Sequence, residues 1–221
     1  MEQTPPVPST FDALPVFPLS GTVLFPNTVL PLHIFEPRYR EMVSDALASD
    51  RLIAVVLAKG STEPGESPEV HEVAGCGRII HHEKLPDGRY NILVQGLARV
   101  RLITELPLQR HYRRFTARVI ARPDENDMSE AKGELAKLQS CVLSLRTLVA
   151  ERDQPLLEVL RSTSDPIDLS DILAASVIST PALQQQVLET VRFKQRLAVL
   201  IDALADVMLQ ISEPSAEQTL N

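Results

Sequence analysis

The chain has 221 residues, enough for one large domain or two small ones with a hydrophobic core of their own. Its 44% hydrophobic and 23% charged residues are typical of globular proteins and exclude a chain that is disordered throughout. A formal net charge of −7 argues against a protein that coats nucleic acid or an anionic membrane, and two cysteines, Cys76 and Cys141, are too few for a disulfide scaffold.

The first half of the chain consists of short apolar segments separated by glycine and proline, a pattern typical of strands. The segment 52–58 is apolar throughout, which predicts a strand buried on both faces. One segment, 37–48, is helical instead, because Pro37 suits a first helical turn and apolar residues follow with a helical period. That apolar stripe consists of Tyr39, Met42, Val43, Ala46 and Leu47. The strands are expected at 13–17, 28–34, 52–58, 73–83, 90–94, 98–106 and 113–121.

Glycines mark particular positions in these strands. Gly75 and Gly77 lie inside the strand expected at 73–83, where they indicate a bulge or the close approach of another backbone. Asp87-Gly88 is expected at the tip of a hairpin, and Gly96 is expected to bend the chain between two short strands. The many short strands and the single early helix predict a small, strongly curved sheet or pseudobarrel.

Beyond Pro123 the pattern changes to long segments with a helical period. After the linker 123–128, Asp127 and Glu130 have the spacing of a capping box, and prolines at 166 and 181 begin two further helices. A last helix is expected at about 191–211. The chain is therefore predicted to be α+β. The expected parts are a β-rich pseudobarrel at 11–123, a helical bundle at 127–212 and flexible tails at 1–10 and 213–221.

Several chemical signatures are absent from the printed sequence. It contains no G-x-x-x-x-G-K-[ST] loop for a nucleotide, no G-x-S-x-G nucleophile elbow and no H-E-x-x-H zinc helix. His71, Cys76, His81 and His82 are close in sequence, but their spacing fits no standard metal site. We therefore expect no enzyme activity, no cofactor, no metal and no catalytic residue. Without a signal peptide or a long apolar run, the expected location is the cytoplasm.

Basic residues gather in the middle of the chain. From His71 to Arg122 there are ten lysines and arginines against four acidic residues. One interpretation is a solvated sheet face whose charges pair across strands. The alternative is a basic surface that binds RNA, although few aromatic residues are nearby to stack on bases. The residues that would carry that alternative are Arg99, Arg101, Arg114 and Arg118.

A second candidate site lies at the segment 30–42 (LPLHIFEPRYREM), where a strand is followed by a helix. Its bulky apolar residues are interleaved with charged ones. They either line a corner of the core or form an apolar groove with a charged rim that receives an extended hydrophobic peptide. The residues of this hypothetical peptide-binding site are Leu32, Ile34, Phe35, Arg38, Tyr39 and Met42.

At this point the sequence resembles a known family. The segments that carry the resemblance are 14–19 (LPVFPL), 24–26 (LFP), 30–32 (LPL), 34–40 (IFEPRYR), 85–90 (LPDGRY), 94–99 (VQGLAR), 165–174 and 194–197 (KQRL). In their order and spacing they are similar to the N-terminal domain of Lon proteases, over about residues 14–209. One departure is Arg192, where Lon proteins often carry an aspartate that caps the last helix, so that Thr190 is expected to cap instead.

The resemblance implies a PUA-like pseudobarrel followed by a helical bundle. It also implies a role in capturing substrate polypeptides, because in full Lon enzymes separate downstream modules hydrolyse ATP and cleave peptide bonds. The resemblance is to the stand-alone members that lack those modules. The expected partners are polypeptide segments with exposed hydrophobic residues and a Lon-type protease or another protein complex, with no membrane; nucleic acid is the less favoured alternative.

Overall fold

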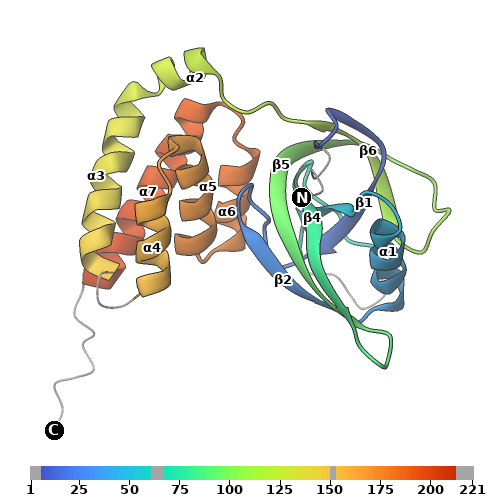
Figure 1. Cartoon of the computed structure of the whole chain (residues 1–221). Helices are drawn as coiled ribbons and strands as arrows, with labels where there is room; N and C mark the ends of the chain where they lie inside the picture. Colours follow the sequence, from blue (N-terminus) through green and yellow to red (C-terminus); the bar gives the residue numbers. More distant parts are fainter. Residues whose placement is uncertain (1–5, 61–66, 150–152, 213–221) are drawn as a thin grey trace, which may run out of the picture. The chain divides into compact units, whose positions relative to one another are not determined.

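The computed structural model describes residues 6–60, 67–149 and 153–212 and confirms the α+β class. The chain divides into two compact units, Met1–Arg122 and Pro123–Asn221 (Figure 1). The expected tail 213–221 and part of the expected tail 1–10 lie outside the described residues. The strands are β1 (Thr10–Leu19), β2 (Val29–Ile34), β3 (Leu52–Leu57), β4 (Val73–Lys84), β5 (Tyr90–Glu105) and β6 (Arg113–Val119). The helices are α1 (Pro37–Leu47), α2 (Glu125–Glu130), α3 (Lys132–Val149), α4 (Gln154–Ser162), α5 (Pro166–Val177), α6 (Pro181–Glu189) and α7 (Phe193–Ser212).

The six strands of the first unit form one mixed sheet in the order β2-β5-β4-β3-β1-β6. An additional pairing between β5 and β6 closes five of these strands into the expected pseudobarrel. The long strand β5 makes this possible, because its first half pairs with β2 and its second half pairs with β6. The sequence predicted a bend at Gly96 between two strands; instead β5 is continuous, and its register with β4 shifts there. Within the described ranges, strand β2 pairs only with β5 and forms one end of the sheet.

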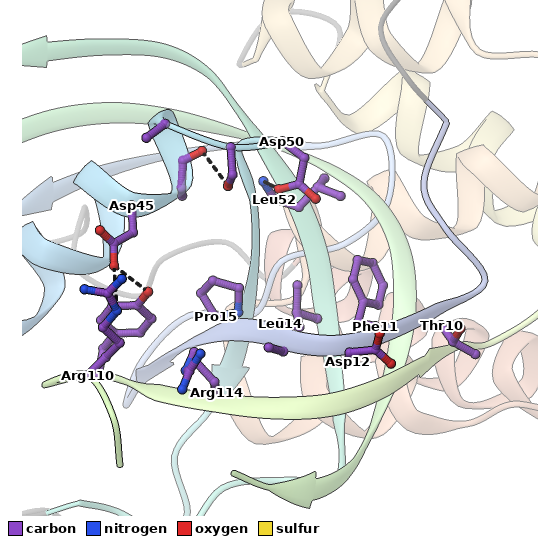
Figure 2. A pocket seen from close by; sticks show the side chains of 15 residues that line it. Thr10, Phe11, Asp12, Leu14, Pro15, Asp45, Asp50, Leu52, Arg110 and Arg114 are labelled. Atoms are coloured by element: carbon purple, nitrogen blue, oxygen red, sulfur yellow. Dashed lines mark hydrogen bonds and ion pairs between the residues drawn. The ribbon is translucent and has the colours of Figure 1, made fainter. Parts of the chain in front are cut away.

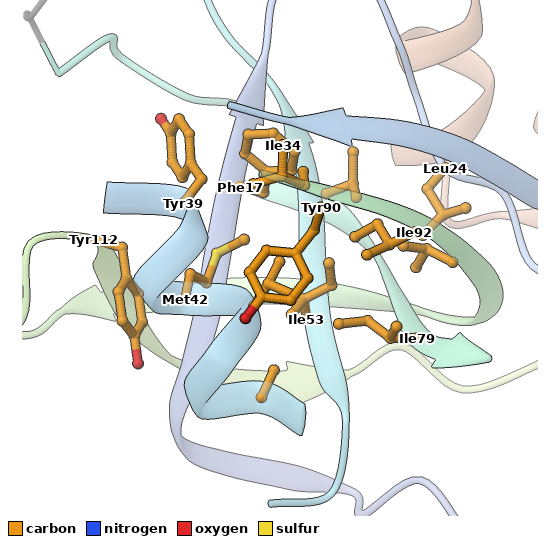
Figure 3. Packing of buried hydrophobic residues seen from close by; sticks show 14 residues of the cluster. Phe17, Leu24, Ile34, Tyr39, Met42, Ile53, Ile79, Tyr90, Ile92 and Tyr112 are labelled. Atoms are coloured by element: carbon orange, nitrogen blue, oxygen red, sulfur yellow. The ribbon is translucent and has the colours of Figure 1, made fainter. Parts of the chain in front are cut away.

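The core of this unit consists of two hydrophobic clusters on opposite faces of β3. Every residue of β3 is buried, as its uninterrupted apolar sequence predicted. Ile53 and Val55 join the cluster under α1, while Leu52 and Ala54 join the second cluster. Figure 3 shows the first cluster, in which the apolar stripe of α1 faces the strands. Burial of this stripe, rather than a capping side chain, holds α1, since Glu36 at its N-cap makes no side-chain capping bond.

The segment between β1 and β2 passes directly over the backbones of β4 and β5. A Cβ atom on Gly75 would lie 1.9 Å from the carbonyl oxygen of Leu24, and one on Gly96 would lie 2.0 Å from that of Phe25. This confirms the close backbone approach predicted for Gly75. The Asn27 N–H donates to the Gly96 carbonyl (2.9 Å) at the end of this segment. The glycines therefore set where the segment crosses the sheet and where β2 begins.

The second unit consists of helices that begin at the expected signals, with three corrections. The capping box lies one turn earlier than predicted: the Asp124 carboxylate accepts from the Asp127 N–H (2.9 Å), and the Asp127 carboxylate accepts from the Asp124 N–H (3.1 Å). Helix α4 was not predicted, although Asp153 caps it. Thr190 does not cap α7, because it ends α6 and its hydroxyl donates to the Gln186 carbonyl (2.6 Å).

Two charged side chains are deeply buried in the described part of this unit, Asp171 of α5 (1% exposed) and Arg196 of α7. Arg196 is likewise only 1% exposed. Its Nε donates to the Thr190 carbonyl (2.9 Å) and its Nη2 donates to the Val191 carbonyl (3.2 Å). The guanidinium group thus satisfies carbonyls at the C-terminal end of α6, where the helix dipole favours a positive charge.

Candidate functional site

The corner between β2 and α1 separates the six residues of the predicted peptide site into two groups. Ile34, Tyr39 and Met42 are buried in the core under α1, so their side chains support the surface from below. Phe35 follows β2 directly and is 60% exposed. Leu32 and Arg38 are half-buried, and Leu32 packs partly against the cluster under α1. The sequence located the corner, but only the structure shows which of its side chains face outward.

A row of exposed residues continues from Phe35 along β2. Alternate side chains of a strand point to the same face, and on β2 the outward set is Val29, Pro31 and His33. Val29 is 52% exposed, and the His33 ring lies 6.4 Å from the Phe35 ring, centroid to centroid, in a stacked arrangement. We call Val29, Pro31, His33 and Phe35 the β2 row. It is a mainly apolar strip at the edge of the sheet.

Polar side chains frame this row and satisfy one another. His33 Nδ1 lies 2.7 Å from Asn91 Oδ1, and Arg89 Nη1 lies 3.2 Å from His33 Nε2. Since arginine only donates, this geometry fits a neutral His33 with its proton on Nδ1. The Arg89 guanidinium also pairs with the Asp87 carboxylate (2.6 Å). The backbone N–H of Arg89 donates to the same carboxylate (3.1 Å), and this hydrogen bond is the main reason that the pKa of Asp87 is lowered. Asn91 Nδ2 donates in turn to Glu83 (3.0 Å).

Two hollows adjoin the corner. One of about 390 Å³ lies on the sheet beside the β2 row and is lined by Pro31, Leu32, His33, His81, Asn91, Ile92 and Leu93. The other, of about 620 Å³, lies at the start of α1 and includes Arg38, Tyr39 and Leu108. There Arg38 pairs with Glu36 (2.8 Å) and its guanidinium stands 4.7 Å from the Tyr39 ring centre. Burial is the main cause that raises the pKa of Tyr39.

A third hollow, of about 530 Å³, lies between β1 and the C-terminal end of α1 (Figure 2). Part of its wall is formed by Arg110 and Tyr112, which both contact Asp45 of α1. The Tyr112 hydroxyl donates to the Asp45 carboxylate (2.9 Å), and Arg110 pairs with the same carboxylate (3.4 Å). Burial and the bond to Asp45 raise the pKa of Tyr112 to about 12. Arg110 and Asp45 thus neutralise each other in this hollow.

The arginines of the RNA alternative do not form one open basic surface. Arg99 is buried, with its guanidinium 5.9 Å from the Phe25 ring centre. Arg101 pairs with Glu72 (3.1 Å), and Arg114 donates to Gln109 (3.0 Å). Arg118 is exposed and lies opposite Arg101 in the β5–β6 register.

Other chemistry is sparse in the part of the chain that the structure describes. No group of three or more His, Cys, Asp or Glu side chains there is placed to hold a metal ion. Both cysteines are free thiols, and burial is the main cause that raises the pKa of Cys76 to about 12. Within the described ranges, none of the helices combines the length and the hydrophobicity that a membrane-spanning segment requires.

Comparison with known proteins identifies the family of this fold. Residues 13–206 match the family model of the ATP-dependent protease La (LON) substrate-binding domain. The chain belongs to the Lon substrate-binding domain family. The match covers both units and confirms the resemblance seen in the sequence.

Curated relatives of this Lon substrate-binding domain are much longer. Lon protease 2 of Myxococcus xanthus is 34% identical over 198 residues, which cover 86% of this chain and 23% of the relative. Lon protease of Anaeromyxobacter dehalogenans (strain 2CP-C) is 30% identical over 195 residues, with the same coverage. The chain thus spans about a quarter of the length of these relatives.

Two solved structures share the fold. The N-terminal domain of the Mycobacterium avium complex Lon protease has a TM-score of 0.66 at 22% identity and covers 88% of this chain and 99% of its own. A Lon N-terminal domain protein from Xanthomonas campestris has a TM-score of 0.60 at 19% identity and covers 87% of this chain and 98% of its own.

Proposed function

We propose that this Lon substrate-binding domain is a non-catalytic module that binds polypeptide segments with exposed hydrophobic residues, through the corner at Phe35. The observation that carries the proposal is the exposure of Phe35 in a mainly apolar row whose polar neighbours are paired with one another. A large ring held in water by a rigid corner is stabilised when a partner covers it. In this proposal Leu32 and Arg38, which are half-buried in the same corner segment, also contact the bound polypeptide.

The wider setting of the proposal comes from the family. We place the protein in the cytoplasm, where it acts as an adaptor that presents unfolded or tagged proteins to a Lon-type protease or another complex. No cofactor takes part. Ile34, Tyr39 and Met42 contribute by packing under the surface and need not touch the ligand.

The direct test is fluorescence anisotropy with a labelled unfolded polypeptide and the Phe35→Glu variant. Removing the ring and adding a charge costs the contact about 1.5–3 kcal/mol, so that affinity falls about tenfold or more. Ile103→Glu is the matched control, because Ile103 is 57% exposed in the same unit, on the distant half of β5. Tyr39 is unsuitable as a probe, since a carboxylate at this buried position would destabilise the core.

The outcomes separate the two binding hypotheses. Salt-tolerant binding that Phe35→Glu abolishes and Ile103→Glu preserves supports the proposal. Equal binding by both variants, with unchanged circular dichroism, refutes the site. Binding to single-stranded RNA that falls steeply with salt would point to the arginine-bearing strands instead, because phosphate contacts release counterions.

A further inference from the structure

Strand β2 is hydrogen-bonded to β5 along one of its two edges. Among the described residues no strand pairs with its other side, because the sheet order begins at β2 and the pseudobarrel closes through β5 and β6. An open strand edge presents N–H and C=O groups in a row that another extended chain can pair with. This edge lies next to the exposed Phe35.

The backbone of β2 is oriented so that alternate residues offer their polar groups outward. The Gly96 N–H donates to the Thr28 carbonyl (2.8 Å), so that carbonyl points toward β5. Successive residues of a strand point their backbone groups to opposite sides. The N–H and C=O groups of Val29 and His33, and the C=O of Pro31, therefore point away from β5, toward the open edge.

Pro31 fits this orientation and limits what the edge can bind. Proline has no N–H, and in a sheet it is tolerated where that N–H would not join the ladder. Its carbonyl still accepts a hydrogen bond. Two β2 edges that paired with each other would each lack a donor at the centre of the ladder, which disfavours a second copy of this chain as the occupant.

The surroundings indicate what kind of segment suits the edge. Arg89 and Asp87, next to the β2 row, form an ion pair with each other, so the charge of each is offset by its neighbour and neither calls for an ionic partner. The outward side chains Val29 and Pro31 are apolar, and the hollow of about 390 Å³ lies beside them on the same face. A strand added there would place every second side chain next to this row.

We infer that the open edge of β2 binds a client polypeptide as an additional β-strand, with apolar side chains at alternate positions along the β2 row. This inference rests on the proposed polypeptide-binding function and specifies how the segment is held. Backbone hydrogen bonds give affinity without reading sequence, while Phe35 and the hollow select apolar side chains. Such a mode suits a protein that must accept many unfolded segments.

The test uses a labelled peptide with apolar residues at alternate positions and two N-methylated versions of it. One version is methylated at the apolar residues, the other at the intervening polar residues. Only one of these two sets of N–H groups can face β2, the first for an antiparallel strand and the second for a parallel one. One version is therefore expected to lose about tenfold or more in affinity, and the other to bind like the parent.

Hydrogen exchange of the full chain gives an independent readout. The amides of Val29 and His33 are expected to exchange quickly in the free protein and about tenfold more slowly with the parent peptide. Parent binding that neither methylation pattern weakens, or that both weaken equally, overturns the inference while the proposed function stands. Slow exchange of both amides before peptide is added also overturns it. Failure of the parent peptide and of unfolded polypeptide to bind refutes the proposed function itself.

Discussion

Replacement of Gly96 by alanine is expected to destabilise the β-rich unit strongly. The added Cβ atom would lie 2.0 Å from the carbonyl oxygen of Phe25, whereas non-bonded heavy atoms are normally about 3.5 Å apart. The segment between β1 and β2 must therefore separate from β5 by more than about 1 Å. The segment cannot move easily, because its Phe25 side chain is fully buried.

The magnitude follows from what this movement disturbs. Gly96 accepts from the Asn27 N–H (2.9 Å) and donates to the Thr28 carbonyl (2.8 Å). Each hydrogen bond contributes about 0.5–1.5 kcal/mol, and overpacking costs about 1–3 kcal/mol. Alanine recovers at most about 1 kcal/mol by restricting the unfolded chain. The net loss is about 3 kcal/mol, a large part of the stability of a typical domain.

Urea unfolding followed by tyrosine fluorescence measures this loss selectively. The chain has no tryptophan, and its three tyrosines, Tyr39, Tyr90 and Tyr112, all lie in the β-rich unit. Gly21→Ala is the matched control, since Gly21 lies in the same unit and a Cβ there meets no atom within 4 Å. A Gly96→Ala variant within about 0.5 kcal/mol of the unaltered chain would refute the close-packing explanation, since overpacking costs at least about 1 kcal/mol.

Two further predictions concern buried groups. At pH 8 a thiol reagent should modify Cys76 only after denaturation, because burial raises the pKa of this thiol to about 12 and keeps it protonated. Half-buried Cys141, whose pKa is also raised by burial, should react slowly in the folded chain. Rapid reaction of both thiols would contradict the structure. Arg196→Met should destabilise the helical unit by about 2–4 kcal/mol, since two carbonyls lose a charged donor. Circular dichroism at 222 nm would measure this during urea unfolding, and an unchanged midpoint would show that water replaces the guanidinium.

Much of the fold was predictable because its signals are local. Pro37 and the stripe from Tyr39 to Leu47 specified α1, and the apolar segment at β3 specified a doubly buried strand. The capping box was misplaced because Asp127 can serve either as a cap or as the third helical residue, and only the contact with Asp124 decides. Helix α4 was missed although Asp153 and Pro155 carry the same start signals used elsewhere.

The candidate site was predictable in position but not in detail. Tyr39 and Met42 satisfied two patterns at once, the helical stripe and the apolar groove, and the structure assigns them to the core. Phe35 is exposed because the chain turns between β2 and α1, a tertiary feature that no local period reveals. The closure of β5 onto β6 depends on pairing across distant parts of the chain, and this closure leaves β2 at the edge.

The position of β1 has a consequence for synthesis on the ribosome. β1 is the first strand of this unit to emerge, yet its antiparallel partner β6 is the last strand of the unit, and Thr10 pairs with Arg118. At about 5–20 residues per second, β1 waits several seconds for that partner. During this interval one side of β1 is open, although β3 covers the other. The nascent unit thus exposes a second strand edge until β6 leaves the exit tunnel, and during that interval the chain is itself an incompletely folded polypeptide with an unpaired strand.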